Sequence, residues 1–230
     1  MKDLSEFEEK INFKFKDARL LKEAFTHRSY LNENPSWDVG QNERLEFLGD
    51  AVLELIVTEH LYKIFPDKPE GELTSFRAAL VNANMLSEVA RELGMNDFIL
   101  LSRGEAKDVG RARQYILANA FEALIGAIYL DQGYEVSKDF IEKSLLTKMQ
   151  EVLEKKLFRD AKSLFQERAQ EISGVTPTYE VLKEWGPDHN KHFVVGVYIG
   201  EKLIGEGEGP SKQEAQQQAA EIGLKAQGWE

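Results

Sequence analysis

Cysteine is absent from this chain of 230 residues. That absence excludes a disulfide framework, a cysteine-ligated zinc site, an iron–sulfur cluster and a thiol nucleophile, and it suits a reducing compartment. The opening segment MKDLSEFEEK is charged rather than apolar, so we expect no secretory signal. Together these features predict a cytoplasmic protein.

Long apolar runs and positive charge are also in short supply. The longest apolar run, Ile116 to Leu130, is interrupted by Asn119 and Glu122. It is shorter than the about 20 residues that a membrane span needs, so we expect no membrane partner. The chain has 29 Lys and Arg against 40 Asp and Glu, a formal net charge of -11. Taken alone, this balance argues against a nucleic-acid-binding protein, because such proteins usually neutralise phosphates with excess Lys and Arg.

The first 155 residues show helical periodicity and almost no strand signal. Asp17 is placed to cap one helix, and Asn42 is placed to cap a long helix from Glu43 toward Ile64. Further helices are predicted at about 71–93, 112–131 and 135–155. Residues 1–155 are therefore predicted to form an all-α domain.

The pattern changes over residues 156–230, where a short linker leads into a helix that begins near Ala161. Three strand-like segments follow, and in the second of them Phe193 to Ile199 alternate at period two, which marks a half-buried strand. Ser211 opens a last helix with Glu214 at capping-box spacing. The order α-β-β-β-α predicts a small α+β domain with two helices on one face of a sheet.

Two helices of the first domain carry acidic side chains among apolar ones. Glu43, Glu46 and Asp50 are spaced three and four residues apart, so they share one helical face. Asn119 and Glu122 are the only strongly polar side chains within residues 116–130. Unpaired carboxylates are costly to bury and repel one another. Oxygen ligands on two apolar helices therefore suit a hard divalent cation.

A second interpretation of these acidic residues remains open. Charged side chains are mostly exposed, so Glu43, Glu46 and Asp50 could lie on a solvated face while Glu122 pairs with an arginine. Spacing along each helix does not decide whether the two helices meet. The four histidines show no catalytic grouping, and we expect His27 to occupy a packing position.

Several motifs resemble those of the ribonuclease III family in its bacterial form, and the resemblance extends over nearly the whole chain. NERLEFLGDAVLEL resembles the family signature, and LLKEAFTHRSY, PEGELT and ILANAFEALIGAIYLDQGY resemble segments before and after it. Residues 159–227 resemble the double-stranded-RNA-binding domain of bacterial members.

The resemblance implies a homodimeric endoribonuclease that uses Mg²⁺, with Mn²⁺ as a substitute, to cut double-stranded RNA. It implies products with 5′-phosphate and 3′-hydroxyl ends, and a role in processing ribosomal and other RNA. The positions that match the family's residues are these: catalytic Asp50 and Glu122; metal ligands Glu46, Asp50, Asn119 and Glu122; secondary acidic residues Glu43 and Glu70; and RNA-binding Gln166, Gln170, His189 and Lys212.

Asn119 departs from the family pattern, which usually has Asp at this position. An amide keeps one neutral oxygen ligand but removes a negative charge, so weaker metal binding is expected. Three explanations remain: a natural active variant, an engineered substitution that traps substrate, or a catalytically weak double-stranded-RNA-binding protein. We favour the active enzyme because the other matched carboxylates are retained.

The RNA-binding half departs from the family through a loss of positive charge. Gln213 and Gln216 stand where family members commonly carry basic residues. We therefore expect RNA binding through few phosphate contacts, with a shallow dependence on salt.

Overall fold

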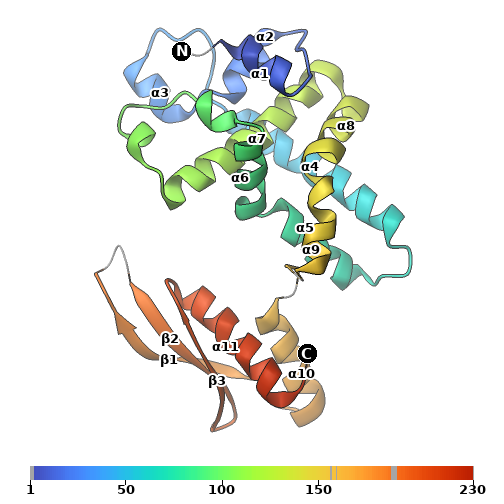
Figure 1. Cartoon of the computed structure of the whole chain (residues 1–230), viewed down its shortest axis with the longest axis vertical. Coiled ribbons are helices and arrows are strands. Elements are labelled where there is room, and N and C mark those ends of the chain that lie inside the picture. The colour runs from blue at the N-terminus through green and yellow to red at the C-terminus, as the bar shows by residue number, and fades with distance from the viewer. Residues whose placement is uncertain (1–2, 156, 159, 188–190, 230) are drawn as a thin grey trace. The chain divides into compact units, whose positions relative to one another are not determined.

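The structure is a computed structural model that describes residues 3–155, 157–158, 160–187 and 191–229. The chain divides into two compact units, Met1–Phe158 and Arg159–Glu230. Phe158 belongs to the first unit, where its ring meets the ring of Phe76 edge-on at 4.6 Å between centroids. Figure 1 shows the helical first unit and the second unit with its sheet.

The first unit is built from helices around two long ones, α4 and α7, in agreement with the predicted all-α domain. Its elements are α1 (Leu4–Lys10), α2 (Ala18–Ala24), α3 (Arg28–Glu33), α4 (Glu43–Ile64), α5 (Glu70–Val81), α6 (Ala83–Glu92), the 3₁₀ turns η1 (Met95–Asp97) and η2 (Glu105–Lys107), α7 (Arg111–Gln132), α8 (Tyr134–Ser144), the 3₁₀ turn η3 (Leu146–Lys148) and α9 (Met149–Glu154).

The apolar run that stood out in the sequence forms the centre of this unit. In α7 the side chains from Ile116 to Ile128 are buried except for Asn119 and Glu122, which are half-buried. Leu53 and Ile56 of α4 are completely buried in the same core. Helices that are apolar on most sides fit only in the middle of a helical domain, where they have neighbours all round.

Three details of the helical unit differ from the sequence-based prediction. The expected helix at 135–155 is divided into α8, the 3₁₀ turn η3 and α9. The expected helix at 71–93 is two helices, because Asn82 ends one and begins the other. Its amide nitrogen donates to the carbonyl of Ala79 at 2.9 Å, and its side-chain oxygen accepts from the backbone N–H of Met85 at 3.0 Å. Asn42 precedes α4 as expected but makes no side-chain cap; it is buried and donates to the carbonyl of Ala24 at 3.2 Å.

The second unit has the predicted order, with α10 (Ala161–Ser173), β1 (Thr178–Trp185), β2 (His192–Ile199), β3 (Lys202–Gly209) and α11 (Lys212–Gln227). The strands pair in the antiparallel order β1-β2-β3. Val195 and Val197 are completely buried beneath α11, as the alternating pattern predicted. Ser211 caps α11 by accepting from the backbone N–H of Glu214 at 3.2 Å.

The helix α11 lies directly on the sheet because β3 is rich in glycine. A Cβ atom at Gly207 would lie 2.2 Å from the backbone nitrogen of Ala219, which is closer than atoms can approach. The glycines of β3 and the alanines of α11 therefore let the two backbones touch. A Cβ atom at Gly209 would lie 2.8 Å from the backbone nitrogen of Ala215, so the start of α11, where Lys212 begins the helix, also lies close to β3.

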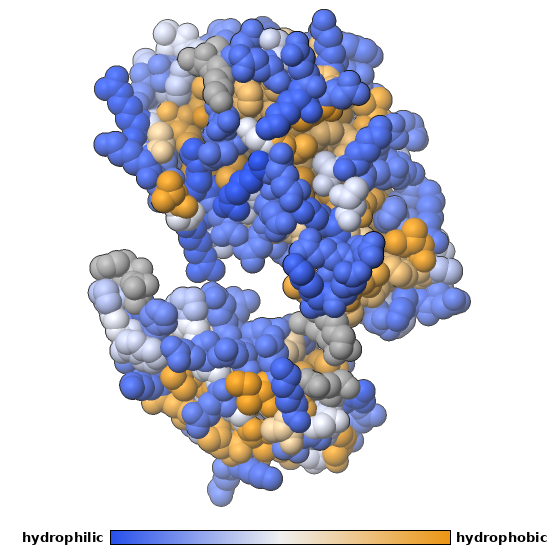
Figure 2. Space-filling view, viewed as in Figure 1, coloured by the Kyte–Doolittle hydropathy of each residue, from blue (hydrophilic) through white to orange (hydrophobic). Residues whose placement is uncertain are grey.

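Polar side chains cover most of the visible face of each unit, with smaller apolar patches between them (Figure 2). Within the described ranges, no helix combines the length and the apolar character needed to cross a membrane.

Candidate active site

The two acidic helices of the first unit meet at a pair of glycines. A Cβ atom at Gly49 of α4 would lie 1.8 Å from the carbonyl oxygen of Glu122 in α7. A Cβ atom at Gly126 would lie 2.2 Å from the carbonyl oxygen of Leu45. Only glycine permits backbones this close, so the crossing brings the acidic faces of α4 and α7 to one place.

Burial and mutual repulsion change the acidity of the carboxyl groups at this crossing. Glu46 and Glu122 are half-buried, while Asp50 is exposed. Burial, with the negative charges of Asp50 and Glu46, raises the pKa of Glu122 to about 8. Burial and the charge of Glu43 raise the pKa of Glu46, and the Asn119 amide acts against this increase. The site therefore has excess negative charge that a cation would offset.

A cavity of about 570 Å³ opens beside the crossing, and we call it the acidic cavity. It is lined by residues of α3, α4, η2 and α7 and of the segments before α3 and α4: His27, Arg28, Asn42, Glu43, Glu46, Glu105, Ala112, Tyr115, Ile116 and Asn119. Asp50 follows Glu46 by one turn of α4, and Glu122 follows Asn119 by about one turn of α7. Of the four predicted metal ligands, Glu46 and Asn119 thus line the cavity, while Asp50 and Glu122 lie on the adjoining helical turns.

The two interpretations of the acidic residues can be compared with this geometry. Glu43 is exposed and lies 3.7 Å from the guanidinium of Arg28, as on a solvated face. The second interpretation expects Glu122 to pair with an arginine. Among the described residues, Glu122 makes no such ion pair. Within those same residues, no three His, Asp or Glu side chains already converge at metal-binding distances.

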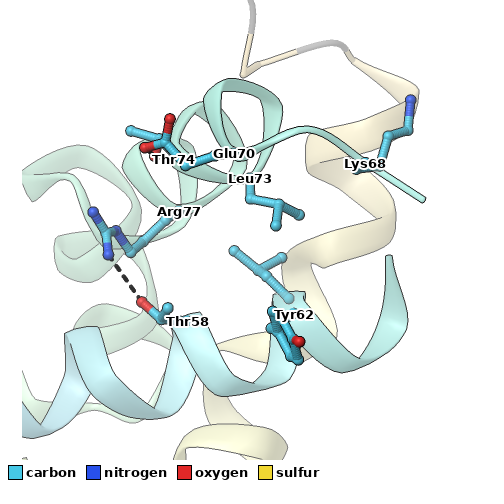
Figure 3. Close-up of a pocket in the computed structure, with 8 residues that line it drawn as sticks. Thr58, Tyr62, Lys68, Glu70, Leu73, Thr74 and Arg77 are labelled. Carbon is cyan, nitrogen blue, oxygen red and sulfur yellow. Dashed lines mark hydrogen bonds between the residues drawn. The ribbon is translucent and has the colours of Figure 1, made fainter. Parts of the chain in front are cut away.

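Glu70, the other secondary acidic residue, lies in a different pocket. This pocket of about 420 Å³ is between α4 and α5, where Arg77 donates to the hydroxyl of Thr58 at 2.9 Å. Figure 3 shows Tyr62 and Leu73 on facing sides of the pocket and Glu70 beside Thr74. Thr58 is 12 residues along α4 from Glu46, which is about 18 Å at 1.5 Å per residue. Within one copy of the chain, Glu70 is therefore separated from the acidic cavity.

Two residues near these pockets were not predicted from the sequence as functional. His27 was expected to be a packing residue, yet it lines the acidic cavity. Phe47 follows Glu46 in α4 with 82% of its surface exposed. An exposed phenylalanine inside an acidic signature is a usable signal for an interaction surface, whereas nothing in the spacing around His27 indicates its position.

The second unit places three of its four predicted RNA-binding residues on its surface. Gln166 and Gln170 are exposed and lie together in a hollow of α10, beside Glu167 and Glu171. Gln170 also accepts a hydrogen bond from the hydroxyl of Thr176 at 3.2 Å. The acidic neighbours lower the positive potential of this face. His189 lies outside the described residues.

Lys212 and Gln216 occupy the first turns of α11. The ammonium of Lys212 lies 5.6 Å from the centre of the Phe193 ring, and the side chain is exposed. Gln216, where the resemblance predicts a basic residue, accepts a hydrogen bond from Lys162 at 2.9 Å. The charge of Lys162 thus partly replaces the one that position 216 lacks.

Comparison with known proteins finds two family matches and relatives of nearly full length. Residues 17–149 match the family described as Ribonuclease-III-like, and residues 161–226 match the double-stranded RNA binding motif. Ribonuclease 3 from Borreliella afzelii is 46% identical over 97% of this chain and 91% of its own length. Ribonuclease 3 from Desulforamulus reducens is 49% identical over 92% and 86%. None of these matches supports the binding-only alternative.

A solved structure has the same fold as the helical unit. It is the nuclease domain of ribonuclease III from Campylobacter jejuni, described as having structural flexibility in a region involved in dimer formation. It is 42% identical, with a TM-score of 0.55, and covers 62% of this chain and 98% of the solved chain.

Proposed function

Because this chain belongs to the ribonuclease III family, we propose that it hydrolyses double-stranded RNA with the carboxyl groups gathered where α4 and α7 cross. The observation that carries this proposal is the contact between Gly49 and the carbonyl of Glu122. Burial at this crossing, together with the negative charges of Asp50 and Glu46, raises the pKa of Glu122 to about 8. Such a concentration of negative charge on apolar helices is typical of a cation-binding catalytic site.

The family implies a divalent cation, and the donor set at the crossing fits one. Carboxylate and amide oxygens are the ligands that Mg²⁺ prefers, and Mn²⁺ accepts the same set. A bound divalent cation supplies an activated water and a counter-charge for the phosphate oxygens. The residues that would hold it are Glu46, Asp50, Asn119 and Glu122.

The residues at the crossing have distinct roles in this proposal. Glu122 must lose its proton before it acts as a ligand, and because burial and the charge of Asp50 raise its pKa, a bound cation would favour that loss. We assign the direct catalytic role to Asp50 and Glu122. Asn119 contributes an uncharged oxygen, so the site has one negative charge fewer than a site with Asp. Glu43, at the rim of the cavity beside Arg28, is a secondary acidic residue.

The chain acts as a homodimer in this proposal, and α4 supplies the contact surface. Phe47, Leu55 and Tyr62 leave 82%, 58% and 73% of their surfaces exposed, which is unusual for large apolar side chains on one helix. The pocket that contains Glu70 opens beside Tyr62 (Figure 3). Glu70 would then belong to the dimer surface and act in a site that two copies complete.

The second unit holds the duplex by its shape. Gln166 and Gln170 offer neutral donors and acceptors to the minor groove, and Lys212 offers a charge to a phosphate. His189 is a fourth proposed contact from the sequence. Processing of ribosomal RNA precursors and a cytoplasmic location remain predictions.

The test is incubation of an end-labelled perfect RNA duplex with the chain in Mg²⁺, in Mn²⁺ and in EDTA, followed by mapping of the product ends. We expect cation-dependent cleavage that leaves 5′-phosphates and 3′-hydroxyls, and no cleavage by Glu122→Gln. Retention of the duplex without cleavage in every cation would instead favour a binding protein.

A further inference from the structure

His27 lines the acidic cavity, and its neighbour Ser29 determines which nitrogen of the imidazole ring has the proton. The backbone N–H of Ser29 donates to Nδ1 of His27 at 3.3 Å, and the Ser29 hydroxyl lies 2.8 Å from the same nitrogen. A backbone N–H can only donate, so the bond from Ser29 N–H makes Nδ1 an acceptor, and the Ser29 hydroxyl, which also accepts from the backbone N–H of Ser102 at 3.1 Å, can donate to it as well. Two donors on Nδ1 require an unprotonated nitrogen there. The ring proton is therefore on Nε2.

The backbone around His27 is held rigidly against the wall of the cavity. The N–H of His27 donates to the carbonyl of Leu100 at 3.1 Å, and the N–H of Leu100 donates to the carbonyl of Phe25 at 2.8 Å. Ser102 continues the same segment, and its hydroxyl accepts from the N–H of Glu105, another residue of the cavity wall. The ring is thus fixed in place as well as in tautomer.

The other ring nitrogen of His27 is available to a ligand. No described residue forms a hydrogen bond with Nε2, and this nitrogen is not among the described buried polar atoms that lack a partner. It therefore reaches solvent on a side chain that lines the same cavity as Glu46 and Asn119. Burial lowers the pKa of His27 despite the nearby charges of Glu105 and Glu43, which agrees with an uncharged ring.

We propose that His27 binds the RNA substrate directly, by donating its Nε2–H to an oxygen of the strand that lies in the acidic cavity. The inference rests on the proposed function, because it is the RNA of the cleavage reaction that provides the oxygen. Phosphate oxygens and 2′-hydroxyls both accept such a bond. The ring is a donor and not a base, since Nε2 already has its proton and Nδ1 is engaged. An uncharged donor also leaves the neighbouring carboxylates free for a cation.

Two substitutions separate the donor from the structural role of His27. His27→Asn keeps an acceptor for the N–H of Ser29, because Asn is a good N-cap residue, but it has no group at the place of Nε2. His27→Gln puts an amide N–H₂ near that place. We expect His27→Asn to lower the single-turnover cleavage rate about tenfold, the effect of one hydrogen bond, with an unchanged melting temperature. We expect His27→Gln to recover part of the rate.

The acceptor is identified with chemically altered duplexes. Single 2′-deoxy or phosphorothioate substitutions are placed at and beside the cleaved bond, and each is tested with the wild type and with His27→Asn. We expect one RNA modification to slow cleavage by the wild type and to have little further effect on cleavage by His27→Asn. If that modification is 2′-deoxy, the acceptor is a 2′-hydroxyl; if it is a phosphorothioate, the acceptor is a phosphate oxygen. If the effects of the RNA modification and of His27→Asn add at every position, the proposal is wrong. It is also wrong if His27→Asn cleaves as fast as the wild type. If the wild type itself does not cleave the duplex, the proposed function is wrong, and the proposed contact is wrong with it.

Discussion

Gly49 of α4 lies against the carbonyl oxygen of Glu122 in α7, so closely that a Cβ atom at Gly49 would be 1.8 Å from it. This contact joins the two acidic segments of the sequence, although Gly49 and Glu122 are 73 positions apart in the chain. It also explains why a glycine follows the apolar residues Phe47 and Leu48 in the middle of a long helix, where glycine is intrinsically unfavourable.

Substitution of Gly49 by Ala should destabilise the helical unit. The added methyl group cannot fit against the Glu122 backbone, so the helices must separate, at a cost of about 1–3 kcal/mol or more. Gly71→Ala in α5 is the matched control, because nothing lies within 4 Å of its Cβ position. That variant should be neutral or gain up to about 1 kcal/mol. Urea unfolding measures both, and equal effects would mean that the close contact is not present in solution.

Substitution of Asn119 by Asp should lower the Mg²⁺ concentration needed for cleavage. An added carboxylate beside Glu46 strengthens the attraction for a cation, and we expect the half-saturating concentration to fall about tenfold. For the chain with Asn119 we expect higher activity in Mn²⁺ than in Mg²⁺. Asn96→Asp adds the same charge where Arg113 already donates to the side chain at 2.8 Å, and it serves as the control. An unchanged rate and cation dependence in Asn119→Asp would remove this position from the ligands.

Glu122 should make the stability of the cation-free protein depend on pH. Its pKa is raised from 4.5 to about 8 in the fold, so the folded state holds a proton that the unfolded state releases between these values. Stability in EDTA should therefore fall as pH rises through this window. Glu122→Gln removes this loss and should be more stable than the wild type by roughly 1–2 kcal/mol at pH 8.5, after allowance for the part of the side chain that faces solvent.

The measurement is urea unfolding in EDTA at pH 5.5 and at pH 8.5. The exposed Glu221 provides the control, since Glu221→Gln removes a carboxylate on α11 without touching the crossing. A stability difference between the wild type and Glu122→Gln that is the same at both values of pH would contradict a raised pKa.

Lys212→Ala should weaken binding to RNA duplexes of any sequence. Loss of one phosphate contact should lower the slope of log affinity against log salt by about 0.7–1. Lys225→Ala removes the same charge from the last turn of the same helix and should leave the slope unchanged. Binding is measured by fluorescence anisotropy at several salt concentrations in EDTA, so that cleavage does not interfere. Equal slopes for both variants would mean that Lys212 does not meet the duplex.

Phe47→Asp should shift the chain from dimer to monomer. A charge on the exposed apolar face of α4 must be desolvated when two copies meet, which costs several kcal/mol. Ile172→Asp, at another exposed apolar position in α10, should not change the oligomeric state. Sedimentation velocity over a range of concentrations distinguishes the two, and a dimeric Phe47→Asp variant would place the contact surface elsewhere.

Local sequence determined the helices and strands and the chemistry of the candidate ligands. Helix starts at Asp17 and Ser211 follow from side-chain oxygens that cap the next turn, and the strand at Phe193 to Ile199 follows from alternation. The spacing of Glu43, Glu46 and Asp50 alone put them on one helical face. These features depend on residues within a few positions of one another, so they can be predicted without knowledge of the fold.

Only the tertiary structure decided which of these residues act together. Contact between α4 and α7 depends on two glycines and on the packing of the whole core. The burial and the repulsion that raise the pKa of Glu122 exist only after the helices have met. The same packing put His27 into the acidic cavity and kept Glu70 out of it. Distances between segments far apart in the chain result from many weak contacts at once, and no local pattern records them.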